Sequence, residues 1–250
     1  MVFNLGVKTS HTNRVVDLIT KIADELGADI TIATACGLLH DAGRFPQFSE
    51  YRTFSDSRSV NHAKLSALVV NESGILGELF NKSESEIIML AILNHNKIAV
   101  GSDISADALL YTNMLRDADK LDILNIMVSH YESPVDEKDG IELGLPDLPI
   151  VTESVMCTAE AGEAVSYADM QCLNDFRILQ IGWAADLNSP TACRIFRDAR
   201  FVERIRGFLP TGARIDKLCE RVTTELDRMI MNPAEVFLGN QLQEKNLSAD

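Results

Sequence analysis

The chain has 250 residues, of which 46% are hydrophobic and 24% are charged, and this composition is ordinary for a globular protein. Its 37 acidic and 23 basic residues give a formal net charge of −14, so a phosphate backbone repels it and binding to long DNA or RNA is disfavoured. A small phosphorylated substrate is still compatible with this charge, because a few local cations and a metal can reverse its sign inside one pocket. No apolar run approaches the roughly 18 residues of a membrane span, and residues 1–10 lack the pattern of a secretory signal.

Apolar residues recur at helical spacing along the first half of the chain. The stripe from Val15 to Leu26 predicts a helix that Gly27 ends, and Asp29 can cap a second helix that Gly43 ends. Three more helices are expected to begin near Ser59, at the capping-box pattern of residues 83–86, and at Ser105.

The second half of the chain begins with a break in this pattern. Prolines and glycines cluster over residues 132–151, helical patterns resume over about 152–187, and Ser189 can cap a helix that has Pro190 at its first position. A last helix is expected over about 211–231. Strand-like alternation is nearly absent, so we predict an all-α fold. We expect a single domain over 1–250, with an N-terminal half over about 1–130, a loop-rich connection over about 132–151 and a C-terminal helical half over about 152–235.

The cysteines and histidines point to the environment and the chemistry of the chain. Five widely spaced cysteines favour free thiols and a cytoplasmic protein. Four of the five histidines lie at or near the ends of predicted helices in the N-terminal half, and they are His11, His40, His62 and His95. A single histidine at a helix end is more often a helix cap or a core hydrogen-bonding residue than a metal ligand, and His130 keeps that explanation.

Carboxylates accompany these histidines. Asp41 directly follows His40, and at the mouth of a helix bundle this pair can reach one ion or two adjacent ions. Further along, Asp117, Asp119 and Asp122 place carboxylates within an apolar helical stretch. Acids in such a stretch need partners, and a cation is one of the better ones.

The order of these residues resembles the His…His-Asp…Asp pattern of the HD-domain superfamily of metal-dependent phosphohydrolases. Residues 11–15 are similar to the family's first-histidine segment, residues 38–45 to its central motif, and residues 117–122 to its last-aspartate motif. In that last motif Asp119, and not Asp117, stands at the position of the ligand. The resemblance covers about residues 10–125. It implies a single-domain HD-type helical bundle with a metal site buried at its centre, in the half over about 1–130.

Two further histidines refine what the resemblance implies. His62 and His95 stand where family members that hold two metals carry additional ligands. The implied ligands of one ion are His11, His40, Asp41 and Asp119, and those of the second are Asp41, His62 and His95, with Asp41 bridging. Mixed nitrogen and oxygen ligands suit one or two divalent transition-metal ions, and Mn, Fe, Co and Zn all qualify.

The resemblance and the metal chemistry together predict a phosphohydrolase. Two adjacent ions can polarise a phosphoryl oxygen, and they provide a metal-bound hydroxide at neutral pH. We expect cleavage of a small, nucleotide-like phosphomonoester or phosphodiester. Arg44, one helical turn after the His-Asp pair, and Arg58 and Lys97, which flank His62 and His95, are candidate phosphate contacts. Some single-metal nucleotidases of the superfamily carry a glutamate base where Arg44 stands, so this arginine favours the metal-bound hydroxide as the nucleophile.

Two other functions are compatible with the same residues. The ligand set resembles that of di-iron HD-domain oxygenases, although the substrate-binding lysines of those enzymes are not identifiable in this sequence. A non-catalytic protein could use the metal site to bind an effector, although such a role has little need of six convergent ligands. The sequence does not choose the substrate, the metal or the oligomeric state.

Overall fold

The computed structural model describes residues 2–101, 103–133 and 144–232. Within these ranges the regular secondary structure is entirely helical, which confirms the all-α prediction. The chain divides into two compact units, and we describe each by itself. Unit 1 comprises the described residues up to Asp122, and unit 2 comprises those from Ile123 onward. The single domain expected over 1–250 stays a prediction.

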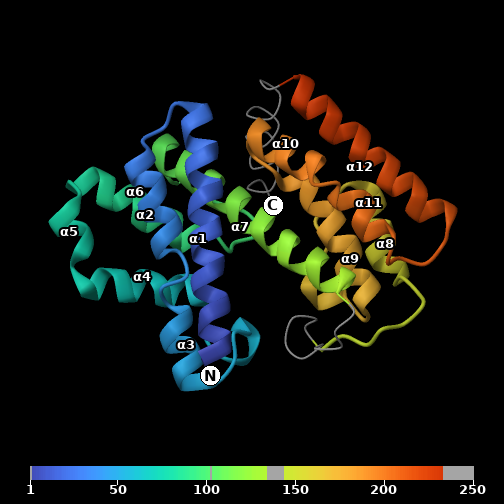
Figure 1. Cartoon of the computed structure of the whole chain (residues 1–250), viewed down its shortest axis with the longest axis horizontal. Coiled ribbons are helices and arrows are strands. Elements are labelled where there is room, and N and C mark those ends of the chain that lie inside the picture. Colours follow the sequence, from blue (N-terminus) through green and yellow to red (C-terminus); the bar gives the residue numbers. More distant parts are fainter. Residues whose placement is uncertain (1, 102, 134–143, 233–250) are drawn as a thin grey trace. The chain divides into compact units, whose positions relative to one another are not determined.

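Unit 1 is built from the helices of the N-terminal half. They are α1 (Val2–Leu26), α2 (Ile30–Leu39), α3 (Arg44–Tyr51), α4 (His62–Ser73), α5 (Ile75–Leu79), α6 (Lys82–Asn94) and the first part of α7 (Ala106–Glu132), with a 3-10 turn, η1 (Asp56–Arg58). Helix α2 packs against α1 and also against α6, and α4 packs against α6 (Figure 1). The apolar stripe of α1, with Val15, Ile19 and Ile22, is fully buried in this core.

Local sequence signals account for several helix ends in unit 1. Gly27 adopts a positive φ of 67° and ends α1, and the Asp29 carboxylate accepts hydrogen bonds from the first backbone N–H groups of α2. Ser105 accepts a hydrogen bond from the Ala108 N–H at the start of α7. These three predicted boundaries are confirmed.

Other predicted boundaries were wrong. Helix α2 ends at Leu39 rather than at Gly43, so the His-Asp pair lies in a turn. The capping box at the start of α6 joins Asn81 to Glu84, because the helix begins at Lys82, ahead of the pattern in residues 83–86. Helix α1 extends back to Val2, so His11 lies within a helix and not near its start.

Unit 2 contains the remaining helices. They are the end of α7, then α8 (Glu153–Ala161), α9 (Leu173–Gly182), α10 (Pro190–Asp198), α11 (Phe201–Arg206) and α12 (Ala213–Met231), with 3-10 turns η2 (Tyr167–Asp169) and η3 (Trp183–Asp186). Ser189 caps α10 with Pro190 at its first position, as predicted, and α12 covers the expected last helix. Part of the predicted connection, 134–143, lies outside the described residues.

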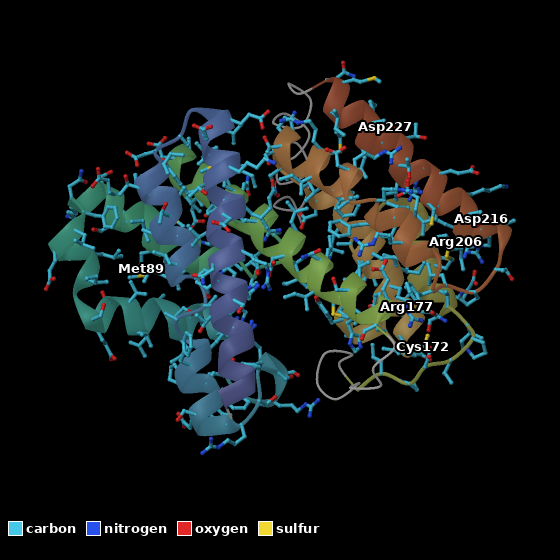
Figure 2. The ribbon with its side chains drawn as sticks, viewed as in Figure 1. Met89, Cys172, Arg177, Arg206, Asp216 and Asp227 are labelled. Atoms are coloured by element: carbon cyan, nitrogen blue, oxygen red, sulfur yellow. The ribbon has the colours of Figure 1, made fainter. Side chains whose placement is uncertain are left out.

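Helix α9 brings polar side chains into the interior of unit 2. Asp175 accepts hydrogen bonds from the N–H and the hydroxyl of Thr152, at 2.7 and 2.6 Å, and from the Gln171 N–H at 2.8 Å. The Arg177 guanidinium (Figure 2) lies 5.0 Å from the ring centroid of Tyr131, where it makes a cation–π contact. The Asp175 carboxylate and the Arg177 guanidinium therefore both have partners within this unit.

Ion pairs and thiols complete the description of unit 2. Arg206 in α11 pairs with Asp216 in α12 at 2.7 Å, and both side chains are labelled in Figure 2. The five cysteines of the chain are free, and Cys157 alone among them is exposed. No helix in the described ranges is both long and apolar enough to cross a membrane.

Candidate metal centre

Five helices of unit 1 and the turn after α2 provide the six predicted ligands, which meet in one place. They are His11 within α1, His40 at the C-cap of α2, Asp41 in the following turn, His62 as the first residue of α4, His95 at the C-cap of α6, and Asp119 within α7. All except Asp119 are buried, and Asp119 is partly buried. Residues far apart in the sequence thus converge in the core of the unit.

Gly43 explains how the turn that holds Asp41 comes close to the start of α4. A Cβ atom at Gly43 would lie 2.4 Å from the backbone nitrogen of Ser66 and 2.8 Å from the carbonyl oxygen of His62, so no larger residue fits. The Gly43 N–H also donates a hydrogen bond to the Ser66 hydroxyl at 2.9 Å. This close packing of backbone on backbone brings Asp41 and His62 together.

The ligand atoms form two adjacent groups. His11, His40 and Asp119 make up the first group, and Asp41, His62 and His95 make up the second; within each group the ligand atoms lie within 4.8 Å of one another. The first group contains the ligands implied for one ion, except that Asp41 is missing from it. The second group contains all the ligands implied for the other ion. Among the described residues, Asp119 is the aspartate of its motif that joins a group, and its role as a ligand stays a prediction.

Asp41 belongs to the second group, and its carboxylate also faces the first group. Its Oδ2 atom is 3.6 Å from the Nε2 atom of His11 and 3.7 Å from that of His40. Its Oδ1 atom is 3.6 Å from the Nε2 atom of His62. Because each oxygen faces a different group, the carboxylate has the placement that a bridging ligand requires.

Backbone carbonyls fix the orientation of two histidines. The Nδ1–H of His40 donates to the Gly37 carbonyl at 2.8 Å, and the Nδ1–H of His95 donates to the Ile92 carbonyl at 2.7 Å. A carbonyl oxygen only accepts, so in the neutral rings the proton is on Nδ1 and the Nε2 lone pair faces the centre. The two rings are thereby prepared to bind a cation.

A carboxylate orients the third histidine, in the first group. The Nδ1 atom of His11 is 2.6 Å from Oδ2 of Asp122. Arg14 holds this carboxylate with two hydrogen bonds, from Nε at 2.5 Å and from Nη2 at 3.0 Å. Such carboxylate partners set the tautomer of a ligating histidine and increase its basicity.

The fourth histidine has an equivalent arrangement in the second group. The Nδ1 atom of His62 is 2.6 Å from Oδ2 of Asp56, in η1. Arg44 and Gln47 donate to the other oxygen of Asp56, at 2.9 and 3.0 Å. Each group therefore has one histidine fixed by a backbone carbonyl and one fixed by a carboxylate that an arginine holds.

Burial and neighbouring charges set the protonation states of these groups when no metal ion is bound. Burial lowers the pKa of His40 and lowers that of His95 to about 3, so both rings are neutral near pH 7. Burial opposes ionisation of Asp41, but Lys8, His40 and Arg44 outweigh it and hold its pKa well below the usual range. Burial likewise acts to lower the pKa of His11, but the hydrogen bonds that its ring donates to the carboxylates of Asp119 and Asp122 raise it to about 9.

The three predicted phosphate contacts have different surroundings. Arg44 is mostly buried, and its Nη1 atom donates to Asp56 and to the Phe54 carbonyl, while its Nε atom lies 3.4 Å from Oδ1 of Asp41. The side chains of Arg58 and Lys97 are exposed. The phosphate contact of each residue stays a prediction.

Sequence reasoning missed the groups that support the ligands. Arg14 and Asp122 lie in segments that resemble the family's motifs, and the spacing of three residues between His11 and Arg14 places both on one face of α1. Asp56 precedes His62 by six residues and carries no signal of its own, because a 3-10 turn brings it back to the ring. Lys8, which donates to Asp41, was also missed.

Comparison with known families agrees with this geometry. The family model for the HD domain matches residues 9–139, more than half of the chain. The chain belongs to the HD domain family. This confirms the resemblance inferred from residues 10–125 and places the protein among metal-dependent hydrolase-like proteins that bind divalent ions. Searches of curated proteins and of solved structures gave no significant match.

The donor set of this HD domain protein fits divalent transition metals. It combines imidazole nitrogens, whose Nδ1 atoms are already engaged, with ionised carboxylates and no thiolate. Nitrogen and oxygen ligands of this kind suit Mn, Fe, Co and Zn alike. The arrangement can hold two ions close together, and such pairs of ions serve hydrolytic chemistry.

Proposed function

We propose that this HD domain protein is a metal-dependent phosphohydrolase that cleaves a small phosphomonoester or phosphodiester. The observation that carries the proposal is the placement of Asp41, whose two oxygens face separate groups of histidines. A single structural ion would need one group, whereas a second adjacent group is what a two-metal hydrolase requires.

Each residue has a defined part in the proposed reaction. His11, His40 and Asp119, with Oδ2 of Asp41, would hold one ion, and His62 and His95, with Oδ1 of Asp41, would hold the other. Divalent ions in such a pair polarise a phosphoryl oxygen and lower the pKa of a bound water enough to supply a nucleophile at neutral pH.

The residues around the ligands keep the centre rigid. Asp122 and Asp56 fix the rings of His11 and His62, and backbone carbonyls fix the other two rings. Because the rings are already oriented, little reorganisation is needed when the substrate binds. Arg14 and Arg44 neutralise the two supporting carboxylates, so the centre keeps the positive character that suits a phosphorylated ligand.

The substrate that we propose is a small, nucleotide-like phosphate ester. The net charge of −14 disfavours long nucleic acids, whereas a small phosphate ester needs only the local cations of the centre. An intracellular, cytoplasmic location is part of the same proposal and rests on the free thiols.

Metal analysis followed by a phosphate-release screen tests this function. The full chain, purified without chelators and then loaded with Mn²⁺, is expected to bind about two ions and to release phosphate from a panel of nucleotides and sugar phosphates. Asp41→Asn should abolish release, whereas Asp24→Asn, an exposed substitution in α1, should not. The screen is repeated without oxygen, because hydrolysis needs none. Turnover that required iron and dioxygen, with no phosphate ester cleaved, would replace hydrolysis with oxygenation.

A further inference from the structure

Lys8 provides a cation at the edge of the candidate metal centre. It precedes His11 by three residues, so the two side chains lie on the same face of α1. Its Nζ atom donates a hydrogen bond to Oδ2 of Asp41 at 2.9 Å and lies 5.6 Å from the ring centroid of Phe54. The side chain is 20% exposed, so the ammonium group lies between the buried ligands and solvent.

The oxygen that Lys8 contacts is the one that faces the first group of ligands. Oδ2 of Asp41 lies 3.6 and 3.7 Å from the Nε2 atoms of His11 and His40. An ion held by those two rings and the Lys8 ammonium would therefore share one carboxylate oxygen. Two cations so close repel each other, and a divalent ion weakens the hold of Asp41 on Lys8.

The other cations near the centre are committed to supporting roles. Arg14 directs two of its N–H groups to Asp122, and Arg44 is held by Asp56 and the Phe54 carbonyl. Among the described residues Lys8 donates one hydrogen bond, to Asp41, and an ammonium group has three donors. Its flexible stem and compact charge are typical of lysines that bind phosphate groups.

We propose that Lys8 is a substrate-binding residue that contacts the phosphate group beside the first group of ligands. The inference rests on the proposed function, because it assigns Lys8 to the phosphate ester that the centre would cleave. When ions occupy the centre, Lys8 exchanges part of its contact with Asp41 for a contact with the phosphate. Lys8 thereby provides a cationic side chain for the phosphate, the role that the sequence suggested for Arg44, Arg58 and Lys97.

The test measures metal and phosphate binding in Lys8→Met and in Lys8→Gln, which keeps a donor for Asp41 but loses the charge. Lys21→Met, an exposed substitution in the same helix, is the matched control. Without substrate, the two Lys8 variants should bind Mn²⁺ at least as tightly as the wild type, because a competing cation has gone. With Mn²⁺ bound, their affinity for inorganic phosphate should fall about tenfold, the lower end for one charge-assisted hydrogen bond. Lys8→Arg, which keeps the charge, should retain most of that affinity.

Several outcomes would overturn the inference. Weaker Mn²⁺ binding in Lys8→Gln would show that Lys8 positions Asp41 for the metal, and unchanged phosphate affinity in that variant would remove Lys8 from the phosphate site. If Lys8→Met does not fold, as judged by circular dichroism, Lys8→Gln alone decides. Failure of the proposed function has a different signature: wild-type protein loaded with Mn²⁺ would neither bind inorganic phosphate nor cleave a phosphate ester.

Discussion

Both units bury ionised aspartates, but the two sets of carboxylates have different partners. In unit 2, Asp175 is fully buried and accepts hydrogen bonds from backbone N–H groups and from the Thr152 hydroxyl. In unit 1, Asp41 faces the Nε2 atoms of three histidines and a lysine ammonium. The first carboxylate has complete local partners, whereas the second lies among atoms that could share a cation.

The Nε2 atoms of the four histidines in unit 1 strengthen this contrast. The Nε2 atoms of His62 and His95 are 3.0 Å apart, and those of His11 and His40 are 3.4 Å apart. In each pair, one ring has its Nδ1–H committed to a backbone carbonyl. Lone pairs directed at one space need a proton or a metal ion between them. Burial of polar groups therefore does not by itself indicate a functional site; the direction of their donors and lone pairs does.

The largest expected effect comes from Asp→Asn substitutions, which replace one carboxylate oxygen with an amide nitrogen, at Asp41 and at Asp175. Asp41→Asn removes the charge that both groups of ligands share, so metal content and phosphate release should fall to background while helicity is preserved. Asp175→Asn, the matched change in unit 2, should lower the melting temperature without changing the number of ions bound. Elemental analysis measures the metal content, an assay of released phosphate measures the activity, and circular dichroism measures the helicity and the melting temperature. Near-normal activity in Asp41→Asn would falsify the bridging role.

The next effect concerns the supporting carboxylates of unit 1. Asp122→Asn and Asp56→Asn keep the size of the side chain but weaken the hydrogen bonds that orient His11 and His62. Loss of such partners typically lowers metal affinity or activity about 10–100-fold, and we expect that range for each variant. Calorimetric titration with Mn²⁺ measures the affinity. Equal affinity in the wild type and both variants would mean that the two carboxylates serve only folding.

In unit 2, the same kind of change should affect stability alone. Asp175→Ala leaves the Thr152 and Gln171 N–H groups without their acceptor in the interior. Hydrogen bonds to charged groups are worth about 1.5–3 kcal/mol, so the free energy of unfolding should fall by about 2–3 kcal/mol. Chemical denaturation measures this loss, with the exposed Asp169→Ala as the control. A loss below about 0.5 kcal/mol, the usual range for surface substitutions, would show that Asp175 is not a structural anchor.

The fold was largely predictable from the sequence because its helices carry their own signals. The apolar stripe of α1, the Asp29 cap and the Ser189 cap are all local patterns, and each appears in the structure. The short helices α3 and α5 were not predicted, because elements of eight and five residues give too few turns for a periodic pattern. The boundary errors at α2 and α6 have the same origin, since several nearby residues could serve as caps.

The candidate site was predictable in its ligands but not in its supports. The order of the histidines and aspartates resembled a family pattern, and the structure brings all six together. Asp56 could not be found in this way, because its contact with His62 depends on the path of η1. Lys8 was also missed, since a lysine early in a helix is most often a solvated side chain. Contacts made through tertiary packing leave no fixed spacing in the sequence.

The smallest expected effect is the pH dependence of the stability that Asp175 provides. Burial acts to raise the pKa of Asp175, but hydrogen bonds from Thr152 and Gln171 outweigh it and lower the pKa below the ordinary value of 3.8. A carboxylate whose folded pKa is depressed stabilises the protein above its unfolded pKa, and this stabilisation is lost as the pH falls through the folded pKa.

The melting temperatures of the wild type and Asp175→Asn should therefore converge as the pH is lowered from about 6 to about 3. The two proteins share every other acidic group, so protonation of the carboxylates in unit 1 affects both and cancels in the difference. The effect is small because, at about pH 3, protonation of a carboxylate with a depressed pKa is only beginning. A constant difference across this range would mean that Asp175 stabilises unit 2 through its shape and donors and not through its charge.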